Sequence, residues 1–359
     1  MSSEAVTASP TETALDWARE RVTACLVEFL DDKIRQAIKL DLPPTVAEIV
    51  KDFVIAGGKR IRPLMCVAGW LACGKEETPD TLIQVAAALE LYQAFALIHD
   101  DVMDKSATRR SRPTVHRELA DRYTAASDPR HLGESVAIMV GNMALTWSDE
   151  LLATAVLAER QAPLAGVINA MREEMHYGQY LDLTSTLGPI DDQRTSMTVI
   201  RYKTAKYTIE RPLHIGAILA GAGTGLLDVL SGFALPLGDA FQLRDDVLGL
   251  YGNPATTGKP IFDDLREGKR TVVLALAARE ATASQRALLE RCVGDSRLNE
   301  RDAQDALDVI AATGAVATVE SMIAERYAQA LAVLDAAPIP PSSAKHLRAL
   351  AALCVERDA

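Results

Sequence analysis

The sequence predicts an all-α protein, and three observations support that prediction. Apolar residues recur at i, i+3, i+4 and i+7 in about a dozen segments, which is the period of a helix with one buried face. The alternation typical of strands is nearly absent. Ala and Leu are abundant, and Ala and Leu favour helices. No flexible linker interrupts the 359 residues. We therefore expect a single helical domain over residues 13–359, preceded by a disordered N-terminus at residues 1–12.

Each expected helix begins where the apolar period begins and ends at a cluster of turn residues. Pro44, Pro63, Pro79 and Pro163 open helices, because Pro suits the first helical turn. Breaks fall at Gly pairs and at polar or Pro-rich runs, namely 57–58, 73–74, 123–133, 184–194, 252–269 and 338–341. In chain order the expected helices are 14–39, 44–55, 63–73, 79–103, 134–160, 163–183, 196–222, 226–249, 271–280, 303–312, 316–335 and 343–356.

The chain is acidic. It has 49 Asp and Glu against 38 Lys and Arg, which gives a net charge of −11. This excess argues against a general nucleic-acid-binding protein, because phosphate backbones require a basic face. An anionic substrate would instead need a local basic patch.

Three further features indicate a cytoplasmic protein. Residues 1–20 are polar and acidic, unlike a signal peptide. No run reaches the roughly 18 uninterrupted apolar residues that a membrane span needs, so we expect no span. The five cysteines include no CxxC pair. They are therefore expected to be reduced thiols that form neither a disulfide framework nor a zinc site.

A cluster of carboxylates closes the long apolar helix expected at 79–103. Asp100 and Asp104 are four residues apart and share one helix face at about 6 Å, whereas Asp101 points roughly 100° away. Like charges at a helix C-terminus repel one another and oppose the helix dipole, so a cation should compensate them. Mg²⁺ suits this place because it takes one or two carboxylates and leaves positions for phosphate oxygens. A solvated acidic helix end is the alternative.

A second pair, Asp245-Asp246, ends another long apolar helix and is followed by a loop with basic residues, as the first cluster is. Two such pairs can face each other across a cavity between helices, as metal sites in helical bundles do. Carboxylates on two walls with Mg²⁺ between them predict a diphosphate as the bound group.

The conspicuous basic residues follow helix ends. The run Gly57-Gly58-Lys59-Arg60-Ile61-Arg62-Pro63 combines a flexible Gly pair with cations, which suits an anion cradle. Further cations stand at Arg109, Arg110, Lys203, Lys259 and Lys269. Each alone is compatible with a solvated surface charge. Together, in an acidic chain, they indicate an anion-binding set.

These motifs make the chain similar to the trans-isoprenyl diphosphate synthases, or polyprenyl synthetases. The resemblance runs from about Gly57 to Thr271 with the motifs in order. They are GGKRIRP at 57–63, DDVMD at 100–104 with Arg109-Arg110, GQYLDL at 178–183, Lys203-Thr204, FQLRDD at 241–246, and GKP with DLREGKRT over 258–271. The resemblance implies an isoprenoid synthase fold, with antiparallel helices around a deep central cavity, and a homodimer.

The reaction implied by the resemblance is head-to-tail condensation of isopentenyl diphosphate with an allylic diphosphate (dimethylallyl, geranyl or farnesyl). Mg²⁺, about three ions per site in the family, would be held by Asp100, Asp104 and Asp245, with Asp101 and Asp246 as further candidates. The implied catalytic set consists of the same three aspartates together with Arg109, Lys203 and Lys259. The side chains of Arg109, Lys203 and Lys259 would hold the allylic diphosphate. Positions matching the isopentenyl diphosphate site are Lys59, Arg62, Gln93 and Arg110, and further pocket positions are Thr204, Gln242 and Lys269.

The chain departs from the family pattern in the second motif, where Gly249 stands in place of a third acid. We expect weakened or altered metal binding rather than inactivity. Ala107 replaces a commonly polar residue, and His99 beside the first motif is expected to be structural, since the chemistry requires no nucleophile.

Product length is expected to depend on side chains upstream of Asp100. Phe95 lies five residues before it, about 7.5 Å along the axis, with the small Ala96 between and Tyr92 a further turn away. In the family this pattern resembles enzymes that form geranylgeranyl diphosphate (C20), and farnesyl diphosphate (C15) is the next expectation. Phe95 and Tyr92 as ordinary core aromatics remain the alternative.

Two other functions were weighed. A terpene cyclase of the same fold should carry an Asn/Ser/Glu metal motif in place of FQLRDD, and none is evident. A non-catalytic subunit of a heteromeric synthase should have lost the acidic motifs or Arg109-Arg110, and this chain keeps both.

Overall fold

The computed structural model describes residues 10–155, 158–252 and 262–356. Helices make up nearly all of this part of the chain. Within it, the strands are the two-residue β1 (Thr108–Arg109) and β2 (Arg112–Pro113), which pair antiparallel as a small hairpin. The prediction of an all-α protein is confirmed. The predicted disordered segment 1–12 lies almost wholly outside the described residues, but its last residues, from Pro10, already belong to the first helix.

The first helices carry the basic loop and the first acidic motif. Their bounds are α1 Pro10–Lys39, α2 Thr45–Ile55, α3 Ile61–Ala72, α4 Asp80–Met103, α5 Val115–Arg122, α6 Pro129–Ala155 and α7 Ala158–Ser185. Pro163, predicted to open a helix, lies inside α7. Helix α5 was not predicted, because it is short, half of its residues are charged, and it buries only Val115, His116 and Leu119.

The middle of the chain forms α8 (Gln193–Val199), η1 (Ile200–Glu210), α9 (Arg211–Ala220) and α10 (Thr224–Tyr251). Sequence periodicity predicts one regular helix over 196–222. The chain is helical throughout this range, but η1 is π-helical, with one residue more per turn than an α-helix. Such segments are rare and concentrate at functional sites.

The last helices are α12 Asp263–Glu267, α13 Val272–Glu280, α14 Ala283–Cys292, α15 Glu300–Ala312, α16 Ala315–Ala336 and α17 Pro341–Val355. Helix α14 was not predicted because it buries little beyond Leu289 and Cys292. A signal for it was present in the sequence. Thr282 and Gln285 form a capping box at its start, in which each side chain bonds the other's backbone N–H.

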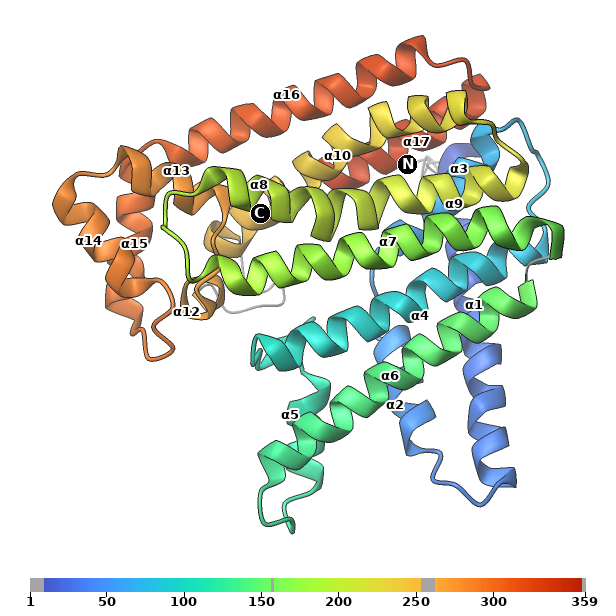
Figure 1. Cartoon of the computed structure of the whole chain (residues 1–359), viewed down its shortest axis with the longest axis horizontal. Coiled ribbons are helices and arrows are strands. Elements are labelled where there is room, and N and C mark those ends of the chain that lie inside the picture. The colour runs from blue at the N-terminus through green and yellow to red at the C-terminus, as the bar shows by residue number, and fades with distance from the viewer. Residues whose placement is uncertain (1–9, 156–157, 253–261, 357–359) are drawn as a thin grey trace, which may run out of the picture.

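Figure 1 shows α4, α7, α9, α10 and α16 as neighbouring rods whose axes are roughly aligned. Two glycines bring α7 and α10 unusually close to η1. A Cβ atom on Gly178 of α7 would lie 2.4 Å from the backbone N of Lys203, and one on Gly238 of α10 would lie 2.4 Å from Cα of Ala205. Larger residues there would push the helices apart. Both glycines therefore set the positions of the helices that border η1.

Within the described part of the chain, two helices, α4 and α10, are long and apolar enough to cross a membrane, and the bent pair α15 and α16 would make a third such segment if counted together. In the most apolar stretch of α4, 72% of the residues are buried inside the protein. Packing within the bundle thus accounts for much of the apolar character of α4.

Candidate active site

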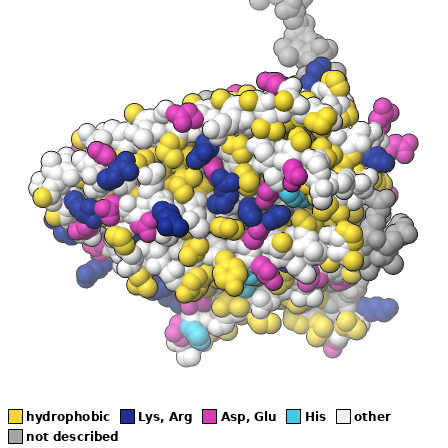
Figure 2. All heavy atoms as spheres, turned by 45° about the horizontal axis from the view of Figure 1, so that its top comes forward, with side chains coloured by type: hydrophobic (Ala, Val, Ile, Leu, Met, Phe, Trp, Pro, Cys, Tyr) yellow, Lys and Arg dark blue, Asp and Glu magenta, His cyan; other side chains and the backbone are white. Residues whose placement is uncertain are grey.

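A cavity of about 1110 Å³ lies among the long helices. Its lining comes from the loop before α3, from α4, α7, η1 and α10, and from residues 264–271. The acidic motifs, Lys203 and Lys269 contribute to this lining. Phe95 and Ala96, which lie a turn or more upstream of Asp100 on α4, contribute an apolar stretch of the wall together with Met175. On the face drawn in Figure 2, basic and acidic side chains gather together across the middle of the molecule. The cavity therefore has a charged end and an apolar end.

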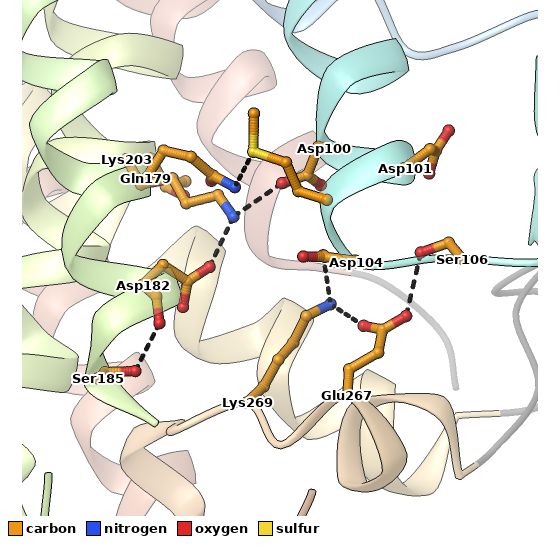
Figure 3. Close-up of polar contacts among 12 residues, drawn as sticks. Asp100, Asp101, Asp104, Ser106, Gln179, Asp182, Ser185, Lys203, Glu267 and Lys269 are labelled. Carbon is orange, nitrogen blue, oxygen red and sulfur yellow. Dashed lines mark hydrogen bonds and ion pairs between the residues drawn. The ribbon is translucent and has the colours of Figure 1, made fainter. Parts of the chain in front are cut away.

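Lys203 of η1 joins α4 to α7. Its Nζ donates to Asp182 Oδ2 at 2.7 Å and to Asp100 Oδ1 at 3.2 Å, as Figure 3 shows. Burial alone would raise the pKa of Asp100, but Lys203 and then Arg109 outweigh it and lower that pKa. Burial would likewise lower the pKa of Lys203, but Asp100 and Asp182 raise it. The ammonium and the Asp100 carboxylate are both charged at neutral pH.

The other two aspartates of the first motif have different surroundings. Asp101 points away from the lysines, on the far side of α4 (Figure 3), and it accepts hydrogen bonds from Arg109. Asp104 lies 3.9 Å from Nζ of Lys269. Burial first, and the neighbouring Asp100 carboxylate second, raise the pKa of Asp104. The first motif thus crowds negative charge at the end of α4, as the sequence spacing predicts.

Lys269 links the first motif to the segment after α10. Its Nζ lies 2.8 Å from Glu267 Oε2 and 3.1 Å from Asp264 Oδ1. Glu267 also accepts a hydrogen bond from Ser106 Oγ at 3.0 Å. Three acidic side chains therefore surround one ammonium group. Burial would lower the pKa of Lys269, which is 24% exposed, but Asp264 and Glu267 raise it.

The second acidic motif enters the cavity from α10. Asp246 is buried and accepts a hydrogen bond from Gln242 Nε2 at 2.8 Å, while Gln242 Oε1 accepts one from Thr204 Oγ1 at 2.7 Å. Burial raises the pKa of Asp246 well above its usual value, and the adjacent Asp245 adds to the effect. Asp245 lines the cavity and is the exposed member of the pair.

Gly249 has a neighbour that the sequence did not suggest. A Cβ atom at this position would lie 2.0 Å from Oδ2 of Asp264, a residue of α12. The carboxylate of Asp264 thus occupies the space into which an acidic side chain at position 249 would project. Asp264 also lines the cavity.

The basic loop before α3 is held by a buried ion pair. Arg60 has a left-handed φ of 53°, and its guanidinium donates to Glu90 Oε1 at 2.5 Å and to the Val54 carbonyl at 2.5 Å. Arg110 donates to the carbonyl of Gly57. Arg60 therefore anchors the loop, and Arg110 ties it to the segment that follows the first motif.

Arg62, Gln93 and Tyr207 form a second polar group on the cavity wall. Arg62 Nη2 donates to Thr208 Oγ1 at 2.6 Å, and its guanidinium carbon lies 4.2 Å from the ring centroid of Tyr207. The Tyr207 hydroxyl donates to Gln93 Oε1 at 2.6 Å. With Lys59 and Arg110, which also line the cavity, these residues make a cationic wall at the basic loop.

Comparison with known proteins agrees with this arrangement. The family model described as polyprenyl synthetase matches residues 43–310 of the chain. The chain belongs to the polyprenyl synthetase family. It is accordingly a prenyltransferase, and its motifs are those of a catalytic family.

Solved and curated relatives of this polyprenyl synthetase cover most of its length. One similar solved structure is that of geranylgeranyl pyrophosphate synthase from Corynebacterium glutamicum, complexed with isoprenyl diphosphate and magnesium. Its sequence identity to this chain is 41% and the TM-score is 0.91. The match covers 96% of this chain and 99% of that one. Geranylfarnesyl diphosphate synthase of Aeropyrum pernix is 31% identical, over 81% of this chain and 87% of the relative. Geranylgeranyl diphosphate synthase of Saccharolobus solfataricus is 28% identical, over 92% of this chain and 96% of the relative.

The donor set of this polyprenyl synthetase fits Mg²⁺. Asp100 and Asp104 crowd each other at the end of α4, and Asp245 faces the same cavity, so a divalent cation would relieve their repulsion. Among the described residues, no group of three acidic, His or Cys side chains is close enough to hold a metal by itself. That agrees with Mg²⁺ chemistry, since this ion uses one or two carboxylates and takes its remaining ligands from water and substrate phosphate.

The structure brings most of the sequence-predicted site residues to one cavity. Those lining it are Lys59, Arg62, Gln93, Phe95, Ala96, Asp100, Arg109, Arg110, Lys203, Thr204, Gln242, Asp245, Asp246 and Lys269. Asp104 lies next to this set through Lys269, and Asp101 lies behind it through Arg109. Lys259 falls outside the described residues. Tyr92, predicted as part of the floor, is 1% exposed and lies behind Phe95 rather than on the cavity surface.

Sequence reasoning missed several polar residues of the site. Asp182 binds Lys203, Asp264 binds Lys269, and Tyr207 connects Arg62 to Gln93. Asp182 belongs to the GQYLDL motif, one turn after Gly178, so a signal for it was available. His99 Nε2 lies 3.0 Å from the carbonyl of Ile138, which is consistent with the structural role predicted for this residue.

Proposed function

We propose that this polyprenyl synthetase condenses isopentenyl diphosphate head-to-tail with an allylic diphosphate, in a Mg²⁺-dependent reaction whose main product is geranylgeranyl diphosphate. The observation that supports this most is a single cavity with a cationic and acidic end and an apolar end. An amphiphilic substrate with a diphosphate head and a prenyl tail matches both ends.

The allylic diphosphate is assigned to the end where α4, η1 and α10 meet. Lys203, Lys269 and Arg109 face it as cations, and Asp100, Asp104 and Asp245 are the carboxylates that would hold Mg²⁺. Mg²⁺, when bound, neutralises charge on the leaving diphosphate. We assign no metal contact to Asp101, because its carboxylate is engaged by Arg109.

The isopentenyl diphosphate is assigned to the wall formed by Lys59, Arg62, Arg110 and Gln93. Arg62 is placed by Thr208 and by the Tyr207 ring, so its guanidinium is oriented before a substrate enters. Such preorganised donors bind phosphate oxygens without reorganising during the reaction. This wall and the acidic end border the same cavity, which brings the two substrates together.

The chemistry needs no protein nucleophile. The C–O bond of the allylic diphosphate breaks, its electron pair stays on the diphosphate, and Lys203 and Lys269 stabilise that growing charge. The double bond of isopentenyl diphosphate then attacks the allylic cation, forming the new C–C bond. A proton is lost from the isopentenyl unit, and the released diphosphate is available to accept it. The apolar wall keeps water from the cation.

Product length is the finer part of the proposal. Phe95 lies about 7.5 Å below Asp100 along α4 and borders the apolar end, which supports a short-chain product. Geranylgeranyl diphosphate is the main product we propose, and farnesyl diphosphate is the alternative. Relatives named for C20 and C25 products both match this chain, so the family alone does not decide the length.

One experiment tests the whole proposal. The pure protein is incubated with isopentenyl diphosphate and with dimethylallyl, geranyl or farnesyl diphosphate in turn, with Mg²⁺ or with a chelator, and the products are analysed by mass spectrometry. Elongated diphosphates formed only with Mg²⁺ support it. Hydrocarbon or alcohol products would instead indicate a terpene cyclase, and no turnover without a second subunit would indicate a non-catalytic partner. Turnover without metal would contradict the mechanism.

We further propose that the chain acts as a cytoplasmic homodimer, with residues 13–359 as one domain. Exposed apolar side chains on α6, such as Ile138 and Met139, support a protein partner for this helix. Light scattering after gel filtration measures the assembly directly, and a monomer at the concentration of the assay would refute the dimer.

A further inference from the structure

The apolar end of the cavity is bordered by two parallel helices. Near their C-terminal ends, Asp100 of α4 and Asp182 of α7 both bind Lys203. Upstream of these residues, Phe95 of α4 contacts His176 of α7, with 6.0 Å between the ring centroids. The two contacts occur in the same order along both helices, so α4 and α7 run in the same direction, as Figure 1 also shows.

Helix geometry puts the two rings at the same depth. Phe95 is five residues from Asp100, about 7.5 Å along α4, and His176 is six residues from Asp182, about 9 Å along α7. Both side chains line the cavity. A chain that grows away from the diphosphate therefore meets Phe95 and His176 together.

The side chain of Tyr92 contacts that of His176. The Tyr92 hydroxyl lies 3.2 Å from His176 Nε2, within hydrogen-bonding distance. The Tyr92 ring is wedged between Phe95, at 5.3 Å between centroids, and Tyr207, at 5.8 Å, and the Arg172 guanidinium carbon lies 5.1 Å from its centroid. With only 1% of its surface exposed, Tyr92 is a fixed support for His176.

The imidazole of His176 is suited to an apolar surface. Its partial burial first, and the charge of Arg172 second, lower its pKa, so the ring is uncharged at neutral pH. Burial raises the pKa of the Tyr92 hydroxyl, which therefore keeps its proton. A neutral pair of rings can lie against hydrocarbon without the cost of burying a charge.

We propose that His176 is the second half of the floor that stops the growing prenyl chain, opposite Phe95, and that Tyr92 is a positioning residue that holds His176 there. This inference rests on the proposed function and identifies α7 as a second determinant of product length beside α4. It also gives Tyr92 a role other than direct contact with the chain.

Substitutions of opposite size at position 176 test the proposal. The enzyme and its variants are assayed with isopentenyl diphosphate and a geranyl or farnesyl primer, and the products are separated by chain length. His176→Ala removes half of the floor, and we expect a main product longer by at least one isoprene unit. His176→Trp fills more of the cavity and should shift the product toward fewer units. Phe95→Ala combined with His176→Ala should lengthen the product beyond either single change.

Tyr92→Phe tests the support, because it keeps the ring and removes only the hydroxyl. The expected result is a broader product distribution that extends to longer chains, smaller in effect than His176→Ala. Tyr177→Ala is the matched control, since Tyr177 is the next residue on α7 but is 70% exposed and does not line the cavity. It should leave product length unchanged.

The outcomes separate this inference from the proposed function. Active His176→Ala and His176→Trp enzymes with the wild-type product length would overturn the inference alone. A shift with Tyr177→Ala equal to that with His176→Ala would overturn it too, because the effect would then not depend on the cavity wall. A wild-type protein that elongates no primer would overturn the proposed function and the inference with it.

Discussion

Arg109 donates hydrogen bonds to the carboxylate of Asp101 from both Nε and Nη2 of its guanidinium group. Nε lies 2.9 Å from Oδ1 and 2.8 Å from Oδ2, and Nη2 lies 2.7 Å from Oδ1. Asp101 is 1% exposed, so this is a buried, charge-assisted pair. Adjacent aspartates of one motif thus differ in their hydrogen bonds. Lys203 donates to Asp100, which lies 3.6 Å from Arg109 and lines the cavity, whereas the hydrogen bonds of Arg109 go to Asp101.

We predict that Asp101→Asn weakens the enzyme through Arg109. An amide offers one acceptor and turns two N–H donors toward the guanidinium, so the arginine loses its fixed orientation. The expected results are a higher KM for the allylic diphosphate, little change in KM for isopentenyl diphosphate, and a loss of about 1–3 kcal/mol in unfolding free energy. Glu118→Gln, which breaks the exposed Glu118–Arg122 pair, is the control and should cost under about 1 kcal/mol. An unchanged KM in Asp101→Asn would contradict this role.

Lys203→Ala should impair catalysis more than substrate binding. The ammonium compensates Asp100 and Asp182 in the structure, and in the proposed reaction it would face the leaving diphosphate. Removing one preorganised donor of this kind costs about 10²–10³ in kcat. Pre-steady-state measurement of product formation in a single turnover would check that the chemical step is slowed. A variant with normal single-turnover rates would show that Lys203 serves only to join α4 to α7.

Gly249 and Asp264 should be strongly coupled. Gly→Ala in a helix interior ordinarily stabilises by roughly 0.5–1 kcal/mol. Here a Cβ atom would meet Asp264 Oδ2 at 2.0 Å and displace that carboxylate from Lys269, so Gly249→Ala should destabilise the native enzyme. In an Asp264→Gly background the same change should stabilise it. Denaturant unfolding of the four proteins of this cycle gives a coupling free energy expected at about 0.5–3 kcal/mol. Additive effects would contradict the contact.

Glu174 should make the unfolding free energy of the protein depend on pH in the acidic range. It binds Lys206 Nζ at 2.5 Å and Arg211 Nε at 2.9 Å, and so ties α7 to η1 and α9. Burial alone would raise its pKa, but the hydrogen bonds from Arg211 and Lys206 outweigh burial and lower it below the ordinary value of 4.5. A lowered carboxylate pKa contributes stability that is present above pH 4.5 and is lost as the pH falls through the folded-state value.

Glu174→Gln should therefore reduce unfolding free energy at pH 7 by about 1–3 kcal/mol, and the difference from wild type should shrink below pH 4.5. Thermal unfolding between pH 3 and pH 7 checks both points. Glu173→Gln, at an exposed neighbouring position, is the control and should follow the wild-type curve. A difference that does not change with pH would indicate that packing, and not charge, accounts for the loss.

Local patterns in the sequence predicted much of the fold and of the site. Helical periodicity located the long helices, because burial of one face of an amphipathic helix leaves its period in the sequence. The spacing of Asp100 and Asp104 placed both on one face of α4, and the same spacing turned Asp101 away from them. These features depend on a few neighbouring residues, so they can be read without a partner element.

The sequence by itself thus determined the long helices, the acidic ends of α4 and α10, and membership of a prenyltransferase family. Tertiary structure decided the rest: the π-helical turn at η1, the contact of Asp182 and Asp264 with the lysines, and the meeting of Phe95 with His176. The Asp264–Lys269 contact is local, but the Asp182–Lys203 and Phe95–His176 contacts depend on the close approach of different helices, which glycines such as Gly178 and Gly238 permit. Such an approach is a property of packing between helices, so it cannot be predicted from the hydrophobic period of a single helix.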